Sequence, residues 1–242
     1  GLGALDNASG NACAVELARI LAPLASDMRR SVRFVLWSGH SHGRYAGSTA
    51  WCDAHFEELE RHCLLNVNSD CLGGRGATVM TESPAMASTR GLARTALREA
   101  AGVTDWRGCR FSRSCDQSFW GAGVPSIFSQ VSEQPPFEGA AADAFGKMFG
   151  SGRTGGFGAW WHTRTDTPDK LDPENLARDV RVFASVLAHA LFDERLPVDA
   201  AAEVLELRDE LKAWQEKAGD ALDLAEVLAR LDLLAEALTA AA

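Results

Sequence analysis

Four short polar segments of the sequence carry side chains that can bind a divalent metal ion. They contain Asp6 in LDNASG, His40 and His42 in GHSHG, Asp70 in NVNSD, and His162 in WWHTRTDTPDKLD. Imidazole nitrogens and carboxylate oxygens are common ligands of zinc and related ions, so these residues together have the chemistry of a metal centre. Their spacing leaves other roles open, because the sequence has no compact metal motif such as HExxH.

Each of these residues also has a structural interpretation. Asp6 can cap the helix that follows it, Asp70 can belong to a turn, and His162 can pack against the adjacent tryptophans. The six cysteines contain no CxxC pair, which argues against a thiolate metal site and favours small buried residues. Cys109 and Cys115 are close enough in sequence to form a disulfide in an oxidising compartment, and the sequence does not decide whether they do.

Helices and strands are expected to alternate around these residues. Apolar residues at helical spacing predict helices at 11–24, 48–61, 89–101 and 175–191, and a short helix at 117–121. Short apolar runs predict strands at 31–37, 63–70, 108–112 and 124–129. This alternation predicts an α/β fold with a mostly parallel sheet covered by helices on both faces. Ligands of such sheets bind beyond the carboxyl ends of the strands, where we expect His42 and Asp70.

The composition changes after Pro197 to Ala, Leu, Glu, Asp and Lys. Two helices are expected there, at about 199–218 and 222–241, and they would form a hairpin. We therefore predict an α/β domain over residues 1–195 and a helical C-terminal extension over 196–242. The Leu and Val stripe of the extension is typical of ordinary helix packing, and association into a homo-oligomer is the alternative.

Composition and charge limit the classes of partner. The net charge of −9 and the lack of a basic face argue against a nucleic-acid partner. No apolar run approaches the roughly 18 residues of a membrane span, so we expect a soluble protein of unspecified compartment. The chain has no signal peptide and no initiating methionine at Gly1, which suggests a processed product, a trimmed chain or an upstream part outside this sequence.

Five segments of the sequence resemble, in the same order, segments of the di-zinc aminopeptidase family. This family includes bacterial leucyl aminopeptidases, glutamate carboxypeptidase and the catalytically inactive transferrin receptor. The segments are LDNASGNACAVELARIL, RSVRFVLWSGHSHGRYAGSTAW, NVNSD, SCDQSFWGAGVPSIF and WHTRTDTPDKLD, and they lie between Leu5 and Asp172. The resemblance implies a zinc-peptidase fold and a metal-dependent hydrolase that cleaves a peptide or small amide substrate.

The resemblance also implies a ligand set. Asp6 would bridge two zinc ions, Asp70 would bind one of them, and His42 and His162 would bind the other. A single ion or another divalent metal remains open. The family's first histidine ligand lies upstream of the bridging aspartate and has no counterpart in this chain. We expect an upstream segment to supply it.

The segment GHSHG departs from the two adjacent glutamates of the family. Counted back from GSTAW, Ser41 occupies the position of the general-base glutamate and His42 that of the glutamate that ligates metal. A serine hydroxyl alone is too weak a base for this role. His40 can take over the proton transfer, Ser41 can act as a nucleophile beside a histidine, or hydrolysis is lost.

The sequence therefore predicts a metallo-aminopeptidase-like hydrolase with His40 and Ser41 as its catalytic candidates. We prefer His40 as the base, because adjacent side chains converge only across a sharp turn, which Gly39 and Gly43 would permit. The alternative is a catalytically inactive structural or binding member of the same fold that associates through its C-terminal helices.

Overall fold

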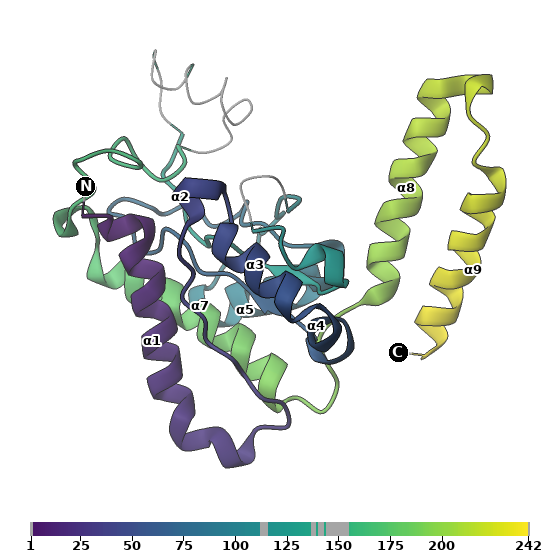
Figure 1. Cartoon of the computed structure of the whole chain (residues 1–242). Helices are drawn as coiled ribbons and strands as arrows, with labels where there is room; N and C mark the ends of the chain where they lie inside the picture. Colours follow the sequence, from purple (N-terminus) through teal and green to yellow (C-terminus); the bar gives the residue numbers. More distant parts are fainter. Residues whose placement is uncertain (1, 112–115, 137–138, 140–142, 144–154, 242) are drawn as a thin grey trace.

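The computed structural model describes residues 2–111, 116–136, 139, 143 and 155–241 (Figure 1). Its α-helices are α1 Gly10–Leu21, α2 His40–Gly43, α3 Ala46–Ala54, α4 Phe56–His62, α5 Arg90–Ala101, α7 Pro173–Phe192, α8 Ala200–Ala218 and α9 Ala225–Ala241. Shorter helical turns are η1 Ala4–Ser9, η2 Ala22–Asp27, η3 Ala87–Thr89, η4 Trp120–Ala122, η5 Pro168–Lys170 and η6 Gly219–Ala221. The strands are β1 Asn66–Val67 and β2 Ser126–Ile127.

The two strands form a parallel pair that leads toward Asp70. Asn66 lies opposite Ser126, and Val67 lies opposite Ile127. The pairing continues beyond the strands, because the Asp70 N–H donates to the Ser129 carbonyl at 2.7 Å. A parallel pair joined to helices confirms the α/β character predicted from the sequence. A larger sheet covered on both faces is not found among the described residues.

Two of the predicted strands are not strands in the structure. Residues 31–39 form a long loop between η2 and α2, and near Cys109 there is only an isolated bridge to Pro84 (Figure 1). An apolar run favours a strand, but a strand also requires a neighbouring backbone to pair with, which local sequence does not specify. Cys115, the proposed disulfide partner of Cys109, lies outside the described residues.

The predicted helices are found within a few residues of their expected ends, with one exception. The helix expected at 48–61 is divided at His55, which has non-helical dihedral angles (φ −121°, ψ 20°). The His55 ring stacks on Trp51 with the ring centroids 4.3 Å apart, and its Nδ1 lies 2.8 Å from the Trp51 carbonyl oxygen. This local contact replaces the continuation of the helix.

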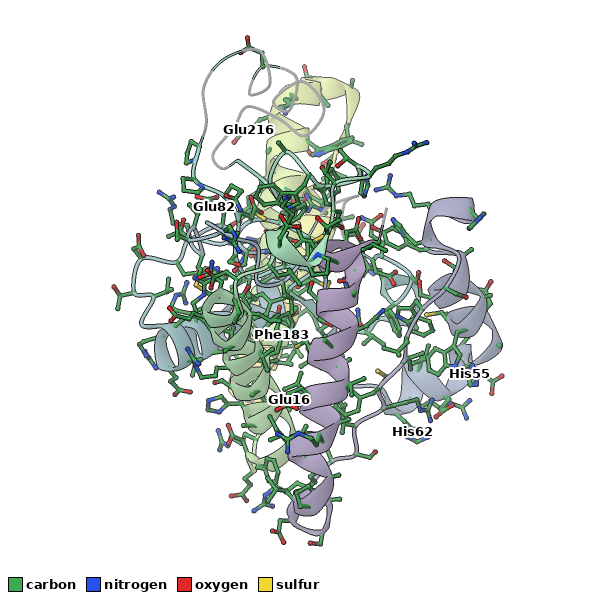
Figure 2. All side chains as sticks on the ribbon, turned by 90° about the vertical axis from the view of Figure 1, so that its left-hand side faces the viewer. Glu16, His55, His62, Glu82, Phe183 and Glu216 are labelled. Carbon is green, nitrogen blue, oxygen red and sulfur yellow. The ribbon has the colours of Figure 1, made fainter. Side chains whose placement is uncertain are left out.

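The main hydrophobic core lies where α1, α5 and α7 meet beside the strand pair. Figure 2 shows Phe183 of α7 between α7 and α1, while Glu16 points outward from α1. Phe183 packs edge-on against Phe128, which follows β2, with the ring centroids 5.7 Å apart. The apolar residues of each helix recur at intervals of three or four, so one face of the helix is buried. The core members are Cys13, Leu17 and Leu21 of α1, Leu92, Ala93, Ala96 and Leu97 of α5, and Val182, Phe183, Val186, Leu187 and Leu191 of α7.

A second, smaller apolar cluster supports the segment GHSHG. It joins α3, α4 and η4 through Cys52, Leu59, Phe119, Ala122 and Val124. Trp37 packs against this cluster, three residues before His40. The cluster therefore holds both sides of the short helix α2.

The C-terminal helices α8 and α9 form the expected hairpin beside the rest of the chain (Figure 1). Glutamates of α8 attach the hairpin to η3 and α5: Glu203 accepts hydrogen bonds from Ser88, and Glu206 pairs with Arg90 at 2.6 Å. The division of the chain at residue 195 stays a prediction. No helix among the described residues is long and apolar enough to cross a membrane.

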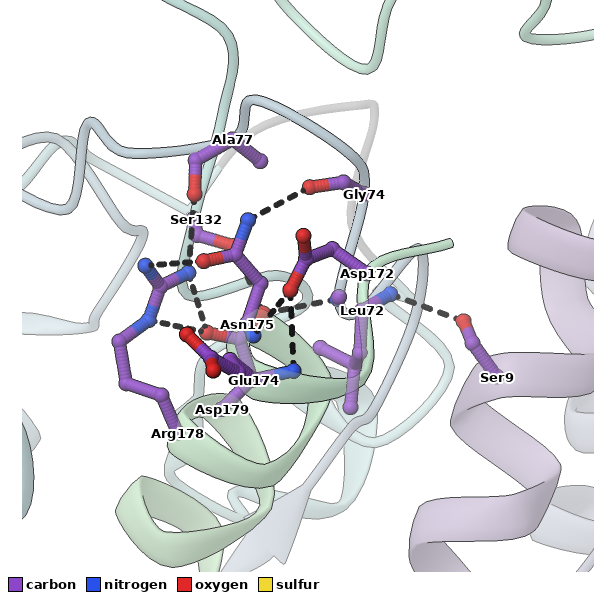
Figure 3. Close-up of polar contacts among 11 residues, drawn as sticks. Ser9, Leu72, Gly74, Ala77, Ser132, Asp172, Glu174, Asn175, Arg178 and Asp179 are labelled. Atoms are coloured by element: carbon purple, nitrogen blue, oxygen red, sulfur yellow. Dashed lines mark hydrogen bonds and ion pairs between the residues drawn. The ribbon is translucent and has the colours of Figure 1, made fainter. Parts of the chain in front are cut away.

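A buried polar network fixes the start of α7 against the loop that follows Asp70. The Asp179 carboxylate is 0% exposed and accepts hydrogen bonds from the Gly73 N–H, the Ser132 hydroxyl and the Arg178 guanidinium (Figure 3). Asn175 of the same helix donates to the Gly74 carbonyl. Because the buried charge is fully paired, the loop at residues 72–74 has one defined position.

We predict that Asp179→Ala destabilises the protein strongly. It leaves the Arg178 charge and the Gly73 N–H without their buried partner, which costs about 3–5 kcal/mol in the free energy of unfolding. Asp209→Ala is the matched control, because Asp209 follows its own arginine partner in the same way but is 65% exposed. Urea unfolding of both variants should separate them, and equal losses would contradict the structural role of Asp179.

His189 links α5 to the end of α7 and predicts a pH-dependent stability. Its Nε2 lies 3.0 Å from Glu99 and its Nδ1 lies 2.7 Å from Asp193, and these carboxylates raise the pKa of His189. The folded protein therefore holds this proton more tightly than the unfolded chain, so the stabilisation is complete below the ordinary value of 6.5 and is lost as pH rises through the raised value.

We predict that His189→Gln lowers the free energy of unfolding by about 0.5–1 kcal/mol at about pH 5.5, and by much less at about pH 9. Urea unfolding at the two pH values measures this difference. A loss of equal size at both would show that packing rather than charge is responsible.

Candidate metal centre

Asp6 lies in the turn η1 and is held there by a second aspartate, which lies 160 residues further along the chain. The Asp166 carboxylate, 2% exposed, accepts hydrogen bonds from the Leu5 N–H at 2.8 Å and the Asp6 N–H at 3.0 Å. Asp166 was not among the candidate ligands identified from the sequence. Its role could not be read from spacing, because the residues it joins are 160 positions apart.

Asn7 connects the Asp6 turn to the segment that carries Asp70. Its side-chain amide donates to the Ser69 carbonyl at 2.9 Å, and its side-chain oxygen accepts from the Gly10 N–H and the Cys71 N–H. Both ends of the amide are used, so Asn7 fixes the distance between the two segments. Sequence reasoning missed this residue, although its position beside Asp6 was the one available signal.

Asp70 follows β1 and lies close to Asp6, as the sequence predicted. One ligand atom from each of Asp6, Asp70 and Cys71 lies within 4.8 Å of the other two. The Cys71 thiol donates to the Asp70 Oδ1 at 3.4 Å. Two carboxylates and a sulfur therefore converge at the carboxyl end of the strand pair.

The electrostatics of this group favour a cation. Burial, and then the negative charge of Asp6, raise the pKa of Asp70 to about 6. Burial, and then the negative charges of Asp70 and Asp6, raise the pKa of the Cys71 thiol well above its ordinary value. A divalent ion between these groups would offset both the repulsion and the burial of charge, so the donor set fits a metal.

His162 reaches Asp6 from the glycine-rich and tryptophan-rich region. Its Nε2 lies 2.9 Å from the Asp6 Oδ2, and its ring stacks on Trp161 with the centroids 3.7 Å apart. The two interpretations of His162 made from the sequence, a metal ligand and a residue packed on tryptophan, are thus compatible. The side chain is 59% exposed, so it lies at the open side of the site.

The segment GHSHG forms the one-turn helix α2, entered through Gly39 with a positive φ of 80°. The His40 Nδ1 accepts a hydrogen bond from the Tyr45 N–H at 3.3 Å, and the two rings lie 4.6 Å apart. A neutral His40 in this arrangement carries its proton on Nε2. His42 is exposed and is not part of the group formed by Asp6, Asp70 and Cys71. The structure describes the backbone of Ser41 but not its side chain.

One large cavity of about 2270 Å³ connects these parts. It is lined by Asp6, His40, His42, Asp70 and His162, among others. The structure therefore gathers the predicted histidines and aspartates around a single space, although only some of them are in direct contact. Asp116, which also lines the cavity, accepts a hydrogen bond from the Ser118 N–H at 2.9 Å, as a turn-capping residue does.

The sequence of the chain matches a known family of peptidases. The family model described as Peptidase family M28 matches residues 1–187. The chain belongs to this family. The resemblance to di-zinc aminopeptidases that the sequence indicated is confirmed.

Two solved aminopeptidase structures are similar to this chain in fold. The aminopeptidase from Aneurinibacillus sp. strain AM-1 aligns with 80% of the chain, with a TM-score of 0.59 and 22% identity. The zinc aminopeptidase from Bacillus subtilis aligns with 79%, with a TM-score of 0.57 and 21% identity. This chain spans only 41% and 43% of those two proteins. Comparison with curated proteins gives no match.

We predict that Asp166→Ala weakens divalent-metal binding by about 10–100-fold, because it releases the backbone of Asp6 without removing a ligand. Competition between the protein and a chelating dye for Zn²⁺ measures this affinity. Asp169→Ala, a change at an exposed carboxylate three residues away, should leave the affinity unchanged. An unaltered affinity in a folded Asp166→Ala variant would show that Asp166 does not position Asp6.

Proposed function

We propose that this chain is part of a zinc-dependent peptidase of the aminopeptidase type, which cleaves a peptide or small amide bond. The observation that carries the proposal is the close approach of Asp6 to both Asp70 and His162 at one end of the strand pair. Membership of the M28 family and the likeness to a zinc aminopeptidase support the choice of reaction and metal.

In this proposal Asp6 would contribute to both of two metal positions. Asp70, which lies close to it, would hold one ion, and His162, whose Nε2 lies 2.9 Å from Asp6, would hold the other. His42, which lines the same cavity, would complete the second position. Zinc, when bound, supplies Lewis-acid polarisation of the scissile carbonyl and lowers the pKa of water. The protein residues fix the donors, and Asp166 and Asn7 keep the two aspartates at their separation.

Proton transfer is assigned to His40. Its Nδ1 accepts the Tyr45 N–H in the structure, so Nε2 is the nitrogen open to proton exchange. As a base, His40 would need the tautomer with the proton on Nδ1 and the Tyr45 contact released. The imidazolium formed when Nε2 takes a proton from water could then return that proton to the leaving amine. These two transfers are the two halves of the role that a glutamate base performs. Ser41 as a nucleophile is the alternative within the same active site.

We also propose that a further metal ligand comes from a polypeptide segment outside these 242 residues. The cavity of about 2270 Å³ is large enough for a further chain segment, and residues 29–37 and 64–69 both line it. Among the described residues, the backbone of 31–38 makes no backbone hydrogen bond, and β1 is paired on one edge only. A segment placed between them would lie next to Asp6 and Asp70.

A catalytically inactive member of the fold remains the second candidate. The hairpin α8–α9 supports it, because Leu207 and Trp214 are exposed and lie seven residues apart on α8. Val227 and Leu234 repeat this spacing on α9, so each pair lies on one side of its helix. A homo-oligomer formed through these side chains would have a structural role without hydrolysis.

Metal analysis combined with a substrate panel tests the proposal. We expect the purified chain to bind zinc, and the whole protein that contains it to cleave aminoacyl or N-acyl amides in a reaction that stops on chelation and in Asp6→Asn. His40→Ala should reduce turnover by about 10²–10⁴-fold while zinc remains bound. His55→Ala is the matched histidine control, since His55 packs on Trp51 outside the cavity.

Absence of zinc, with no uptake on titration, would remove the metallopeptidase proposal. Bound zinc without turnover of any substrate of the panel by the whole protein would favour the inactive candidate.

A further inference from the structure

We infer that Cys71 is a thiolate ligand of the metal held by Asp6 and Asp70. The inference rests on the proposed metal centre and adds to it a sulfur donor that the family resemblance did not imply. From the sequence all six cysteines were interpreted as small buried residues. In the structure, the Cys71 thiol lies against the Asp70 carboxylate and belongs to neither apolar cluster.

The distances around Cys71 suit a shared metal. Its Sγ lies 3.4 Å from the Asp70 Oδ1. One carboxylate oxygen from each of Asp6 and Asp70 lies within 4.8 Å of the sulfur and of the other oxygen. A tetrahedral zinc with bonds of about 2.3 Å to sulfur and about 2.0 Å to oxygen separates these two donors by about 3.5 Å. The Asp70 and Cys71 donors are therefore already at the spacing that one zinc ion requires.

The surroundings of Cys71 differ from those of the buried cysteines in the apolar cores. Cys13 belongs to the main core and Cys52 to the second cluster, where each fills space among hydrophobic side chains. Cys71 is only 3% exposed but belongs to neither cluster, and its side chain meets the carboxylates of Asp70 and Asp6. A buried sulfur placed against two carboxylates is poorly explained by apolar packing.

The backbone turns Cys71 toward the site. Its φ of 53° is in the left-handed region, and its N–H is held by the Asn7 side-chain oxygen at 3.2 Å. The same amide fixes the Asp6 turn, so the sulfur and the two carboxylates are positioned by one residue. Trp161, which stacks on His162, lies near the Cys71 side chain.

Thiolate ligation has a simple chemical balance. The S–H bond of Cys71 breaks, a metal–sulfur bond forms, and the proton leaves to solvent, with no change in oxidation state. The thiolate brings one negative charge to the site. It would replace the negative charge that the site lacks because His42 stands at the position of the family's metal-binding glutamate.

Cobalt(II) titration of the whole 242-residue chain tests the inference through absorption, independently of activity. A thiolate bound to Co²⁺ gives a sulfur-to-metal charge-transfer band in the near ultraviolet, which carboxylate and imidazole ligands do not give. We expect this band in the wild type, its loss in Cys71→Ser and Cys71→Ala, and metal affinity lower by roughly tenfold or more in both variants. Cys13→Ser and Cys109→Ser, at a buried apolar position and an exposed one, should retain the band.

The outcomes distinguish the two proposals. Visible d–d absorption of bound Co²⁺ without the charge-transfer band would overturn Cys71 as a ligand and leave the metal centre intact. A band that persists in Cys71→Ala would also overturn it. A wild-type chain that binds no cobalt or zinc would contradict both proposals, and circular dichroism of each variant verifies that the comparison is between folded proteins.

Discussion

Asp6 and Asp70 are held close together at the carboxyl end of a parallel strand pair, although their charges repel. Neither residue could keep this position by its own local structure. The Asp166 carboxylate binds the backbone beside Asp6, and the Asn7 amide ties the same turn to Ser69 and Cys71. The structure thus places negative charge where only a cation, or a proton on Asp70, relieves the repulsion. The proposed chemistry depends on this placement.

The remainder of the fold holds the segments that carry Asp6, Asp70 and Asp166 in fixed positions relative to one another. The α1 helix follows the Asp6 turn directly and is anchored by its apolar face against α7. The α7 helix in turn fixes the loop after Cys71 through the buried carboxylate of Asp179 (Figure 3). The α7 helix begins just after the segment with Asp166, which binds the backbone of Asp6. The same helix carries Asp179, which fixes the loop after Asp70. Such buried, fully paired networks specify position more than they add net stability.

The segment GHSHG gives the site a different composition from the two-glutamate pattern to which it was compared. His40 is already engaged through Nδ1, which limits its proton exchange to Nε2. His42 remains exposed on the cavity wall. Sulfur at Cys71 would shift the donor set toward softer ligands and restore a negative charge. Together these features would give the proposed metal centre a ligand chemistry different from the two-glutamate pattern.

The sequence alone determined the helices, the family and the identity of most candidate ligands. Helical periodicity is a local property, so α1, α5, α7, α8 and α9 could be placed within a few residues. Strand pairing is not local, and for that reason residues 31–37 were predicted as a strand that the structure does not contain. Only the tertiary structure revealed Asp166, Asn7 and Cys71 as parts of the site. Their roles arise from contacts between segments far apart in the chain, and no spacing along the sequence encodes such contacts.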